Sequence, residues 1–427
     1  MKFSITTLGC KVNSCESAAI SAAFLAAGYT PAEEGGPADV YVINSCAVTG
    51  MGVKKARQAV SHCKSQNPEA ITVLCGCYPQ AYPEEAERDC SADIITGNAN
   101  KSEIPMMVSK FLAEHRRFSC VDQLSREFDE SSAAPDLDRT RAFIKIEDGC
   151  DRFCTYCIIP TARGRVRSLP PEEITAQANQ AASAGNREIV LTGINIGCYG
   201  EDIGYTPADA VMAAQVEGIE RVRLGSLEAD TLTDEEISRL KACEKLCPHF
   251  HLSLQSGSDA VLKRMKRRYA CGEYSALVEK LRAAFPGCSI TTDIMVGFPG
   301  ETDEEFAESM AFVEKLGFAK IHVFPYSIRP GTVAGMRPNQ VLPHVKSARA
   351  REMNALAARI EQEYLERQTG SIQTVLIEKQ TSPEFCHGFT GSYIPVRIYG
   401  EDIPRHTLAQ VKITGAGQGF CTGTTKF

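Results

Sequence analysis

Three cysteines near the middle of the chain have a spacing that is typical of metal-cluster chemistry. Cys150, Cys154 and Cys157 form a CxxxCxxC motif directly after a predicted strand at Phe143–Ile146. Three thiolates within eight residues can hold one face of a four-iron, four-sulfur cluster, and they leave the fourth iron open to a small molecule. A zinc site is the alternative, but structural zinc usually takes four ligands, and no fourth cysteine is close in the sequence.

A second set of cysteines is spread over the first part of the chain. Cys10, Cys46 and Cys77 each follow a predicted strand, and those strands are Phe3–Leu8, Asp39–Asn44 and Ile71–Leu74. Loops after neighbouring parallel strands converge on one crevice, so we expect the three thiols to meet there and to hold a second cluster with an open iron. Cys75 is the alternative third ligand, but its place inside the strand favours Cys77.

Alternating strands and helices predict an α/β fold in several parts. Residues 1–120 predict a parallel α/β domain, residues 121–140 a linker, and residues 141–370 a partial barrel of six strand–helix units. The barrel strands are predicted at Phe143–Ile146, Glu188–Leu191, Arg221–Leu224, His251–Leu254, Ile290–Val296 and Ile321–Phe324. Residues 371–427 are rich in Gly, Thr, Val and Ile with frequent turn residues, which predicts a small antiparallel β-barrel.

Composition narrows the class of protein. The net charge of −7 gives no global argument for a nucleic-acid partner, so any RNA affinity has to come from local basic patches. No run approaches the ~20 apolar residues of a membrane span, and the start lacks the apolar core of a signal peptide. We therefore expect a cytoplasmic protein without a membrane partner, in which some of the 18 cysteines bind metal or clusters.

The CxxxCxxC motif closely resembles that of the radical S-adenosylmethionine (SAM) superfamily. This resemblance implies that SAM binds the open iron, and that an electron from the cluster cleaves it to a 5′-deoxyadenosyl radical. Loops after the barrel strands would then hold SAM or substrate, because functional loops gather on that face of a barrel. The candidate residues are Gly193, Asn195, Ser226, Glu228, Gln255, Ser256, Ser258 and Gly297.

Nearly the whole chain is similar to the methylthiotransferase family of radical SAM enzymes. Three segments resemble the branch that acts on N6-threonylcarbamoyladenosine beside the anticodon, at position 37 of tRNA: TLGCKVN at 7–13, LTGINIG at 191–197 and HVFPYS at 322–327. The resemblance implies a radical-generating [4Fe–4S] cluster on Cys150, Cys154 and Cys157. It also implies an auxiliary [4Fe–4S] cluster on Cys10, Cys46 and Cys77, whose open iron carries the donated sulfur.

The same resemblance implies the reaction and its partners. One SAM would methylate the sulfur and a second would supply the radical that activates C2 of the adenine. No catalytic residue is predicted beyond the clusters, since C2–H is too weakly acidic for a side-chain base and no His/Asp pair is obvious. The implied partners are tRNA, a reducing electron donor and a sulfur source, and the last segment would be an RNA-binding barrel of the TRAM type.

Two groups of basic residues are candidates for phosphate contacts. They are Arg163, Arg165 and Arg167, just after the cysteine motif, and Lys263, Arg264, Lys266, Arg267 and Arg268. The alternative for the second group is a solvated helix end near a carboxy-terminal dipole. Arg163 and Arg165 are also the first candidates to pair with the threonyl carboxylate of the substrate.

Three other functions are weighed against this one. The nearest is methylthiolation of a ribosomal-protein side chain, and the next is a radical SAM reaction in which the first cluster only relays electrons. The third is a non-catalytic iron–sulfur carrier, which would not need so many strand ends suited to holding SAM. The sequence predicts neither the tRNA isoacceptors nor the oligomeric state.

Overall fold

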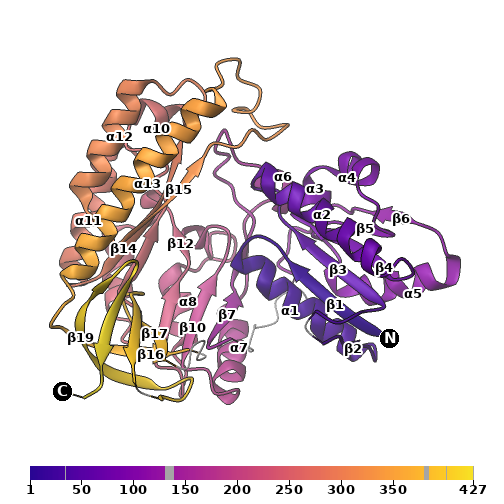
Figure 1. The fold of residues 1–427 in the computed structure, drawn as a ribbon, viewed down its shortest axis with the longest axis horizontal. Coiled ribbons are helices and arrows are strands. Elements are labelled where there is room, and N and C mark those ends of the chain that lie inside the picture. The colour runs from indigo at the N-terminus through magenta and orange to yellow at the C-terminus, as the bar shows by residue number, and fades with distance from the viewer. Residues whose placement is uncertain (34, 130–138, 379–383, 401, 427) are drawn as a thin grey trace.

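The computed structural model describes residues 1–33, 35–129, 139–378, 384–400 and 402–426. Figure 1 shows an amino-terminal domain on one side, a larger helix-covered barrel beside it, and a small β-barrel at the foot of the larger one. The α/β class and this three-part architecture confirm the predicted fold. Residues 130–138, which belong to the predicted linker, lie outside the described residues.

The amino-terminal domain is a six-stranded parallel sheet in the order β2-β1-β3-β4-β5-β6. Both faces of its central strands are apolar, as is usual for a parallel sheet covered by helices on each side. Ile43 and Leu74 pack toward α2, whereas Val42 and Val73 pack with residues of α1 and α5. The strands are β1 (Lys2–Thr7), β2 (Thr30–Pro31), β3 (Val40–Ser45), β4 (Ile71–Gly76), β5 (Ile94–Thr96) and β6 (Phe118–Cys120). The helices are α1 (Lys11–Ala26), α2 (Gly50–Gln66), α3 (Cys77–Ala81), α4 (Pro83–Asp89), η1 (Lys101–Glu103) and α5 (Ile104–Glu114).

The central barrel is a curved wall of two parallel sheets, β11-β10-β7 and β12-β13-β14-β15. Gly225 alone separates β11 from β12, so the two sheets follow one another as a partial barrel. The strands are β7 (Arg141–Lys145), β10 (Glu188–Thr192), β11 (Arg221–Leu224), β12 (Ser226–Leu227), β13 (His249–Leu252), β14 (Ser289–Val296) and β15 (Lys320–Pro325). A short antiparallel pair, β8 (Glu147–Asp148) and β9 (Arg167–Ser168), frames the cysteine motif.

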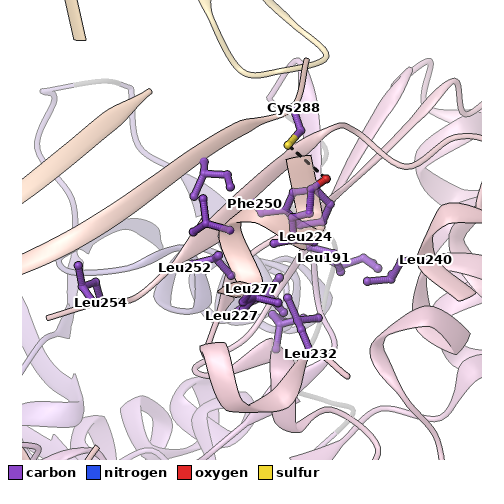
Figure 2. Packing of buried hydrophobic residues seen from close by; sticks show 14 of the residues in the cluster. Leu191, Leu224, Leu227, Leu232, Leu240, Phe250, Leu252, Leu254, Leu277 and Cys288 are labelled. Atoms are coloured by element: carbon purple, nitrogen blue, oxygen red, sulfur yellow. Dashed lines mark hydrogen bonds between the residues drawn. The ribbon is translucent and has the colours of Figure 1, made fainter. Parts of the chain in front are cut away.

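Helices cover the outside of this wall and bury its apolar side chains. Figure 2 shows Leu191, Leu224, Phe250 and Leu252 in this layer, together with leucines from the surrounding helices. The helices are α6 (Ile159–Arg163), α7 (Pro171–Ser183), η3 (Ile196–Cys198), α8 (Pro207–Ala214), η4 (Ala229–Thr231), α9 (Asp234–Lys241), α10 (Asp259–Met265), α11 (Cys271–Ala284), α12 (Asp303–Leu316) and α13 (Pro343–Glu366). Because side chains alternate along a strand, the intervening residues face the inside of the barrel.

The carboxy-terminal barrel is closed by five strands in the order β16-β17-β18-β20-β19. Its pairs are antiparallel except β18–β20, which is parallel and completes the closure. The strands are β16 (Ile372–Ile377), β17 (Phe385–Thr390), β18 (Pro395–Tyr399), β19 (Leu408–Gly417) and β20 (Phe420–Thr424). Val375, Val396 and Val411 form its core against Leu365 of α13. Over the described ranges, no helix has the length and apolar character needed to cross a membrane.

Candidate functional site

The CxxxCxxC motif forms a tight loop between β8 and α6. Cys150 and Cys154 are buried, Cys157 is half-buried, and the Cys157 amide donates to the Cys154 carbonyl at 3.0 Å. Burial, together with the neighbouring Cys154 and Cys150 thiols, raises the pKa of Cys157 to about 12. Gly149 opens the loop with φ of +91°, and a Cβ there would lie 1.9 Å from the Arg165 carbonyl oxygen. Only glycine therefore allows the chain to pass Arg165 and bring the three thiols together.

The second set of cysteines converges from three neighbouring strands. Cys10 precedes α1 after β1, Cys46 follows β3, and Cys77 begins α3 after β4. Burial, together with the nearby Cys77 and Cys10 thiols, raises the pKa of Cys46 to about 11. Asn13 ties two of these loops together, because its Nδ2 donates to the carbonyls of Leu8 at 2.7 Å and of Ser45 at 3.0 Å.

Cys75 and Cys77 point into different surroundings. Cys75 lies in the apolar core under the sheet, with no exposed surface. Cys77 packs with Ala47 and accepts a hydrogen bond from Asn98 Nδ2 at 3.5 Å. After burial, the nearby Cys77 thiol also raises the pKa of Cys46 and of Cys10, so Cys77 lies near both. The geometry thus supports the choice of Cys77.

The two cysteine sets face each other across a direct domain contact. Ala47 and Cys77 pack against Ile158 and Ala162, which follow the CxxxCxxC motif. Asn98 Nδ2 crosses the same contact and donates to the Ala162 carbonyl at 2.6 Å. In Figure 1, α6 accordingly lies against the amino-terminal domain beside α3. The two sets are therefore neighbours in space although they lie far apart in the sequence.

A buried ion network fixes this contact. Arg163, at the end of α6, donates from Nη1 to Glu16 Oε1 at 2.8 Å and to Asp148 Oδ1 at 2.9 Å. Lys101 and Lys145 pair with the same Glu16 carboxylate. Burial alone would raise the pKa of Glu16, but Arg163, Lys101 and Lys145 hold it well below its usual range. Such a network is costly to desolvate, so its value lies in setting one arrangement of α1 and α6.

A cavity of about 260 Å³ opens between the two cysteine loops and the barrel. Val48 and Thr49 bound it on the amino-terminal side, and Cys157 on the motif side. The barrel contributes strand ends and loop residues, among them Gln255, Asp293, Met295, Phe324 and Tyr326. The cavity thus lies next to the predicted radical-generating site and within reach of the loop that carries Cys46.

The donor sets fit iron–sulfur clusters. Each set offers three thiols, and thiolate sulfur is the ligand type that such clusters take from proteins. Within the described residues, no three His, Cys, Asp or Glu side chains come close enough together to hold a single metal ion.

Comparison with known proteins decides the family. Residues 144–313 match the radical SAM superfamily, and residues 2–97 match a family described as the uncharacterized protein family UPF0004. The threonylcarbamoyladenosine tRNA methylthiotransferase MtaB of Bacillus subtilis (strain 168) is 39% identical over 98% of this chain and 94% of its own length. The chain belongs to the methylthiotransferase family of radical SAM enzymes.

Two further comparisons give a second relative in that family and a solved structure with a similar fold. A tRNA-2-methylthio-N(6)-dimethylallyladenosine synthase of Pelotomaculum thermopropionicum is 32% identical over the full chain and 98% of its own length. Among solved structures, the radical SAM methyltransferase TsrM from Kitasatospora setae aligns with a TM-score of 0.56 and 14% identity, over 78% of this chain and 75% of that one. This last similarity shows a shared fold. The cofactors of a radical SAM methylthiotransferase are SAM and [4Fe–4S] clusters, as predicted.

Some of the predicted SAM-binding residues lie beside the methylthiotransferase cysteine motif. Gln255 lines the 260 Å³ cavity. Glu228 accepts a hydrogen bond from Arg267 Nη1 at 2.8 Å, and the same Nη1 lies 3.4 Å from Cys154 Sγ. Beyond Gly193, the backbone amides of Ile194 and Asn195 donate to Glu147 Oε2.

Glu147 is a buried group that the sequence did not single out. Burial raises its pKa well above the usual range, against the lowering effect of the Asn195 and Ile194 amides. Its Oε1 has no hydrogen-bond partner within the part of the chain that the structure describes. A buried carboxyl oxygen is thus available next to Gly193 and Asn195 for a bound ligand.

Other residues that were predicted to bind SAM contact neighbouring helices of the protein. Ser256 and Ser258 are buried, and they hydrogen-bond to Ser309 and Glu308 of α12. Gly297 forms a turn with φ of +71°, where a Cβ would lie 2.3 Å from the Lys346 side chain. These three strand ends turn toward α12 and α13, and a role in binding SAM stays a prediction for them. Ser226 lines a second cavity, described below.

The basic residues predicted to contact RNA differ in the solvent exposure of their side chains. Arg163 has no exposed surface, Arg167 is buried beside Asp148, and Arg267 is buried beside Glu228. Arg264 is half-buried and forms a bidentate pair with Glu305. The guanidinium groups of these four are held by carboxylates, and a role in binding phosphate stays a prediction for them. The candidates that remain exposed are Arg165, Lys263, Lys266 and Arg268.

A His/Asp pair lies inside the barrel, where the sequence had indicated none. His251 Nε2 lies 3.3 Å from Asp293 Oδ2, and its Nδ1 lies 2.9 Å from Thr291 Oγ1. The pair forms because β13 and β14 are in register, with His251 opposite Thr291. Alternation of polar and apolar residues at 249–252 is the signal that could have indicated an inward-facing His251.

Proposed function

We propose that this protein adds a methylthio group to C2 of N6-threonylcarbamoyladenosine-37 in tRNA. The observation that carries the proposal is the direct contact of the two three-cysteine sites, through Ala47 and Cys77 on one side and Ile158 and Ala162 on the other. The reaction needs a sulfur donor and a radical source close to the same carbon, C2 of the adenine. The higher identity to the threonylcarbamoyladenosine enzyme, 39% against 32%, supports this branch over the dimethylallyladenosine one.

Each cofactor has its residues in this proposal. Cys150, Cys154 and Cys157 hold the SAM-binding cluster, and Cys10, Cys46 and Cys77 hold the auxiliary cluster. When bound, the two clusters supply the electron for SAM cleavage and the sulfur that is transferred. Gly193, Asn195, Glu228 and Gln255 would hold SAM. Glu147 Oε1, which has no hydrogen-bond partner among the described residues, would be available beside Gly193 and Asn195.

The protein's own side chains position the reactants and exclude water. Arg163 and Glu16 hold the two cysteine loops in one arrangement through their buried pair. Arg267 keeps Glu228 in place next to Cys154. Tyr156 and Met295 close the 260 Å³ cavity with apolar surface, which shields a radical from solvent.

Each domain has its own role in this proposal. Residues 1–120 carry the auxiliary cluster, 141–370 form the radical SAM barrel after a linker at 121–140, and 371–427 form a TRAM-type barrel that binds RNA. Arg165, Lys263, Lys266 and Arg268 offer exposed positive charge for phosphates. The protein works in the cytoplasm, where a reducing electron donor and a sulfur source complete its set of partners.

Mass spectrometry of tRNA nucleosides tests the proposal. Cells lacking the gene should lose 2-methylthio-N6-threonylcarbamoyladenosine, keep the unmethylthiolated nucleoside, and regain the product when the gene is restored. A variant with Cys10, Cys46 and Cys77 changed to Ala is the matched control, and it should not restore the product. An unchanged nucleoside profile, with a ribosomal protein losing its methylthio group instead, would contradict the tRNA assignment.

A further inference from the structure

A second cavity, of about 410 Å³, lies where the three folded parts meet. Lys11 from α1 bounds it on one side, and the turn between β17 and β18, with Ser392 and Tyr393, on another. The inside of the barrel supplies Ser226, His249, His251, Thr291 and His322, and α13 supplies Glu361 and Tyr364. Its volume falls in the range of small-molecule pockets, ~300–1,000 Å³.

This cavity adjoins the smaller one beside Cys157. His251 lines the larger cavity and Asp293 lines the smaller one, and the two side chains contact each other at 3.3 Å. In adenine, C2 and C6 flank N1, so their substituents leave the ring in different directions. A base with C2 near Cys157 can therefore direct its N6 substituent into the neighbouring larger cavity.

Lys11 and Lys320 line this cavity, and of the two it is Lys11 that lacks a carboxylate partner among the described residues. Lys320 pairs with Glu361 at 3.0 Å. The nearby Arg141 and Arg223, which do not line the cavity, pair with Glu378 at 2.9 Å and with Glu188 at 2.8 Å. Among the described residues, no carboxylate oxygen lies within 4 Å of Lys11 Nζ, which instead sits 5.9 Å from the centre of the Phe143 ring. An anion bound at Lys11 would balance the charge of an ammonium group that has no carboxylate beside it among the described residues.

The rest of the lining suits a small polar group with an apolar end. Ser226, Thr291 and Ser392 line the wall with hydroxyl groups, while Leu224 and Ile394 give it apolar surface. The pKa values of His249 and His322 are lowered, mainly by burial, so both imidazoles are neutral near pH 7. They offer hydrogen bonds to uncharged groups and leave the anion to Lys11.

We propose that this cavity binds the threonylcarbamoyl substituent of the substrate adenosine, and that Lys11 pairs with its carboxylate. The inference rests on the proposed function and names the residue that selects its substrate. It replaces Arg163 as carboxylate partner, because Arg163 is already held by Glu16 and Asp148. In this arrangement Lys11, next to Cys10, binds the threonylcarbamoyl group while C2 of the adenine faces the clusters.

Two anticodon stem-loops test the proposal, one with threonylcarbamoyladenosine and one with its neutral carboxamide. The reconstituted wild-type enzyme should bind and methylthiolate the carboxylate form with a preference of roughly tenfold or more, since a hydrogen bond to a charged group contributes that much. In Lys11→Met the preference ratio should fall to about one, and in Lys11→Arg it should largely return. Lys110→Met, an exposed lysine on the outer helix α5, is the matched control and should keep the wild-type ratio.

The possible outcomes distinguish a failure of the Lys11 site from a failure of the proposed function. A wild-type enzyme that treats both stem-loops alike would overturn the carboxylate site while leaving the methylthiotransferase function in place. A preference that persists in Lys11→Met would overturn the role of Lys11. Product from neither stem-loop, with SAM cleavage intact, would overturn the proposed substrate itself. The ratio is independent of total activity, and the wild-type comparison stands even where a Lys11 variant loads its clusters poorly.

Discussion

Arg163 and Glu16 form a fully buried ion pair, 2.8 Å between Nη1 and Oε1, that joins helix α6 to helix α1. One helix follows the CxxxCxxC motif and the other begins after Cys10, so this pair sets the relation between the two cysteine sites. Arg163 Nη2 also donates to Asn13 Oδ1 at 2.6 Å, and Asn13 in turn holds the Leu8 and Ser45 carbonyls. The relative position of the clusters thus depends on side chains that ligate neither.

Removing one partner of this pair should therefore damage the protein severely. Glu16→Gln replaces the carboxylate that Arg163, Lys101 and Lys145 share with a neutral amide, and breaking a buried pair typically costs about 3–5 kcal/mol. We expect a clearly lowered thermal midpoint and loss of methylthiolation. The matched control is Glu314→Gln, which removes an exposed partner of Arg359 and should change stability by less than about 1 kcal/mol. Equal midpoints for the two variants would contradict a structural role for the network.

The cluster count gives the second prediction. Two three-cysteine sites predict roughly eight iron and eight sulfide per anaerobically reconstituted chain if each holds a [4Fe–4S] cluster. Replacing Cys150, Cys154 and Cys157 together with Ala should halve both and abolish SAM cleavage. Replacing Cys243, Cys247 and Cys288, which are buried thiols of the barrel, is the control and should leave the iron content unchanged. Unchanged iron in the first variant would disprove the assignment of the radical cluster.

A third prediction separates the roles of the two sites. With Cys10, Cys46 and Cys77 replaced by Ala, the barrel should still cleave SAM, because the CxxxCxxC loop and its glycine turn belong to another part of the chain. Methylthiolated product should disappear. Cys75→Ala is the control, since its thiol lies in the apolar core and not beside Cys46. Product formed at the normal rate by the triple variant would show that other residues present the sulfur.

The glycine before the motif gives a fourth prediction. In Gly149→Ala, the added Cβ would meet the Arg165 carbonyl at 1.9 Å, and the φ of +91° would also be strained. We expect loss of about half the iron with the auxiliary cluster retained, as measured by iron analysis and absorbance. Gly272→Ala is the control, because a Cβ there meets nothing within 4 Å and the residue lies in a helix. Full iron content in Gly149→Ala would mean that the loop can accommodate a Cβ at residue 149 and still hold the cluster.

Sequence alone predicted those parts of the site that depend on local order along the chain. The cysteines were predictable because each follows a strand, and parallel strands bring their following loops to one edge. The pairing of Arg163 with Glu16 was not, because it depends on how α1 packs against α6 across 147 residues. Likewise, Ser256 and Ser258 have the right position after a strand, but their direction follows from contacts with α12.

The substrate branch gives the last prediction. The reconstituted enzyme should methylthiolate tRNA that already carries the threonylcarbamoyl group, and react poorly with the same tRNA unmodified or with an isopentenylated tRNA. The physical reason is that drawing the base out of the anticodon stack costs a few kcal/mol, less from a loop than from a duplex. A carboxylate that pairs with Lys11 offsets part of that cost, whereas an isopentenyl group offers no charge. Turnover on the three matched tRNAs, measured by nucleoside mass spectrometry, tests this prediction. Equal turnover on all three would contradict the branch assignment and leave the methylthiotransferase family assignment intact.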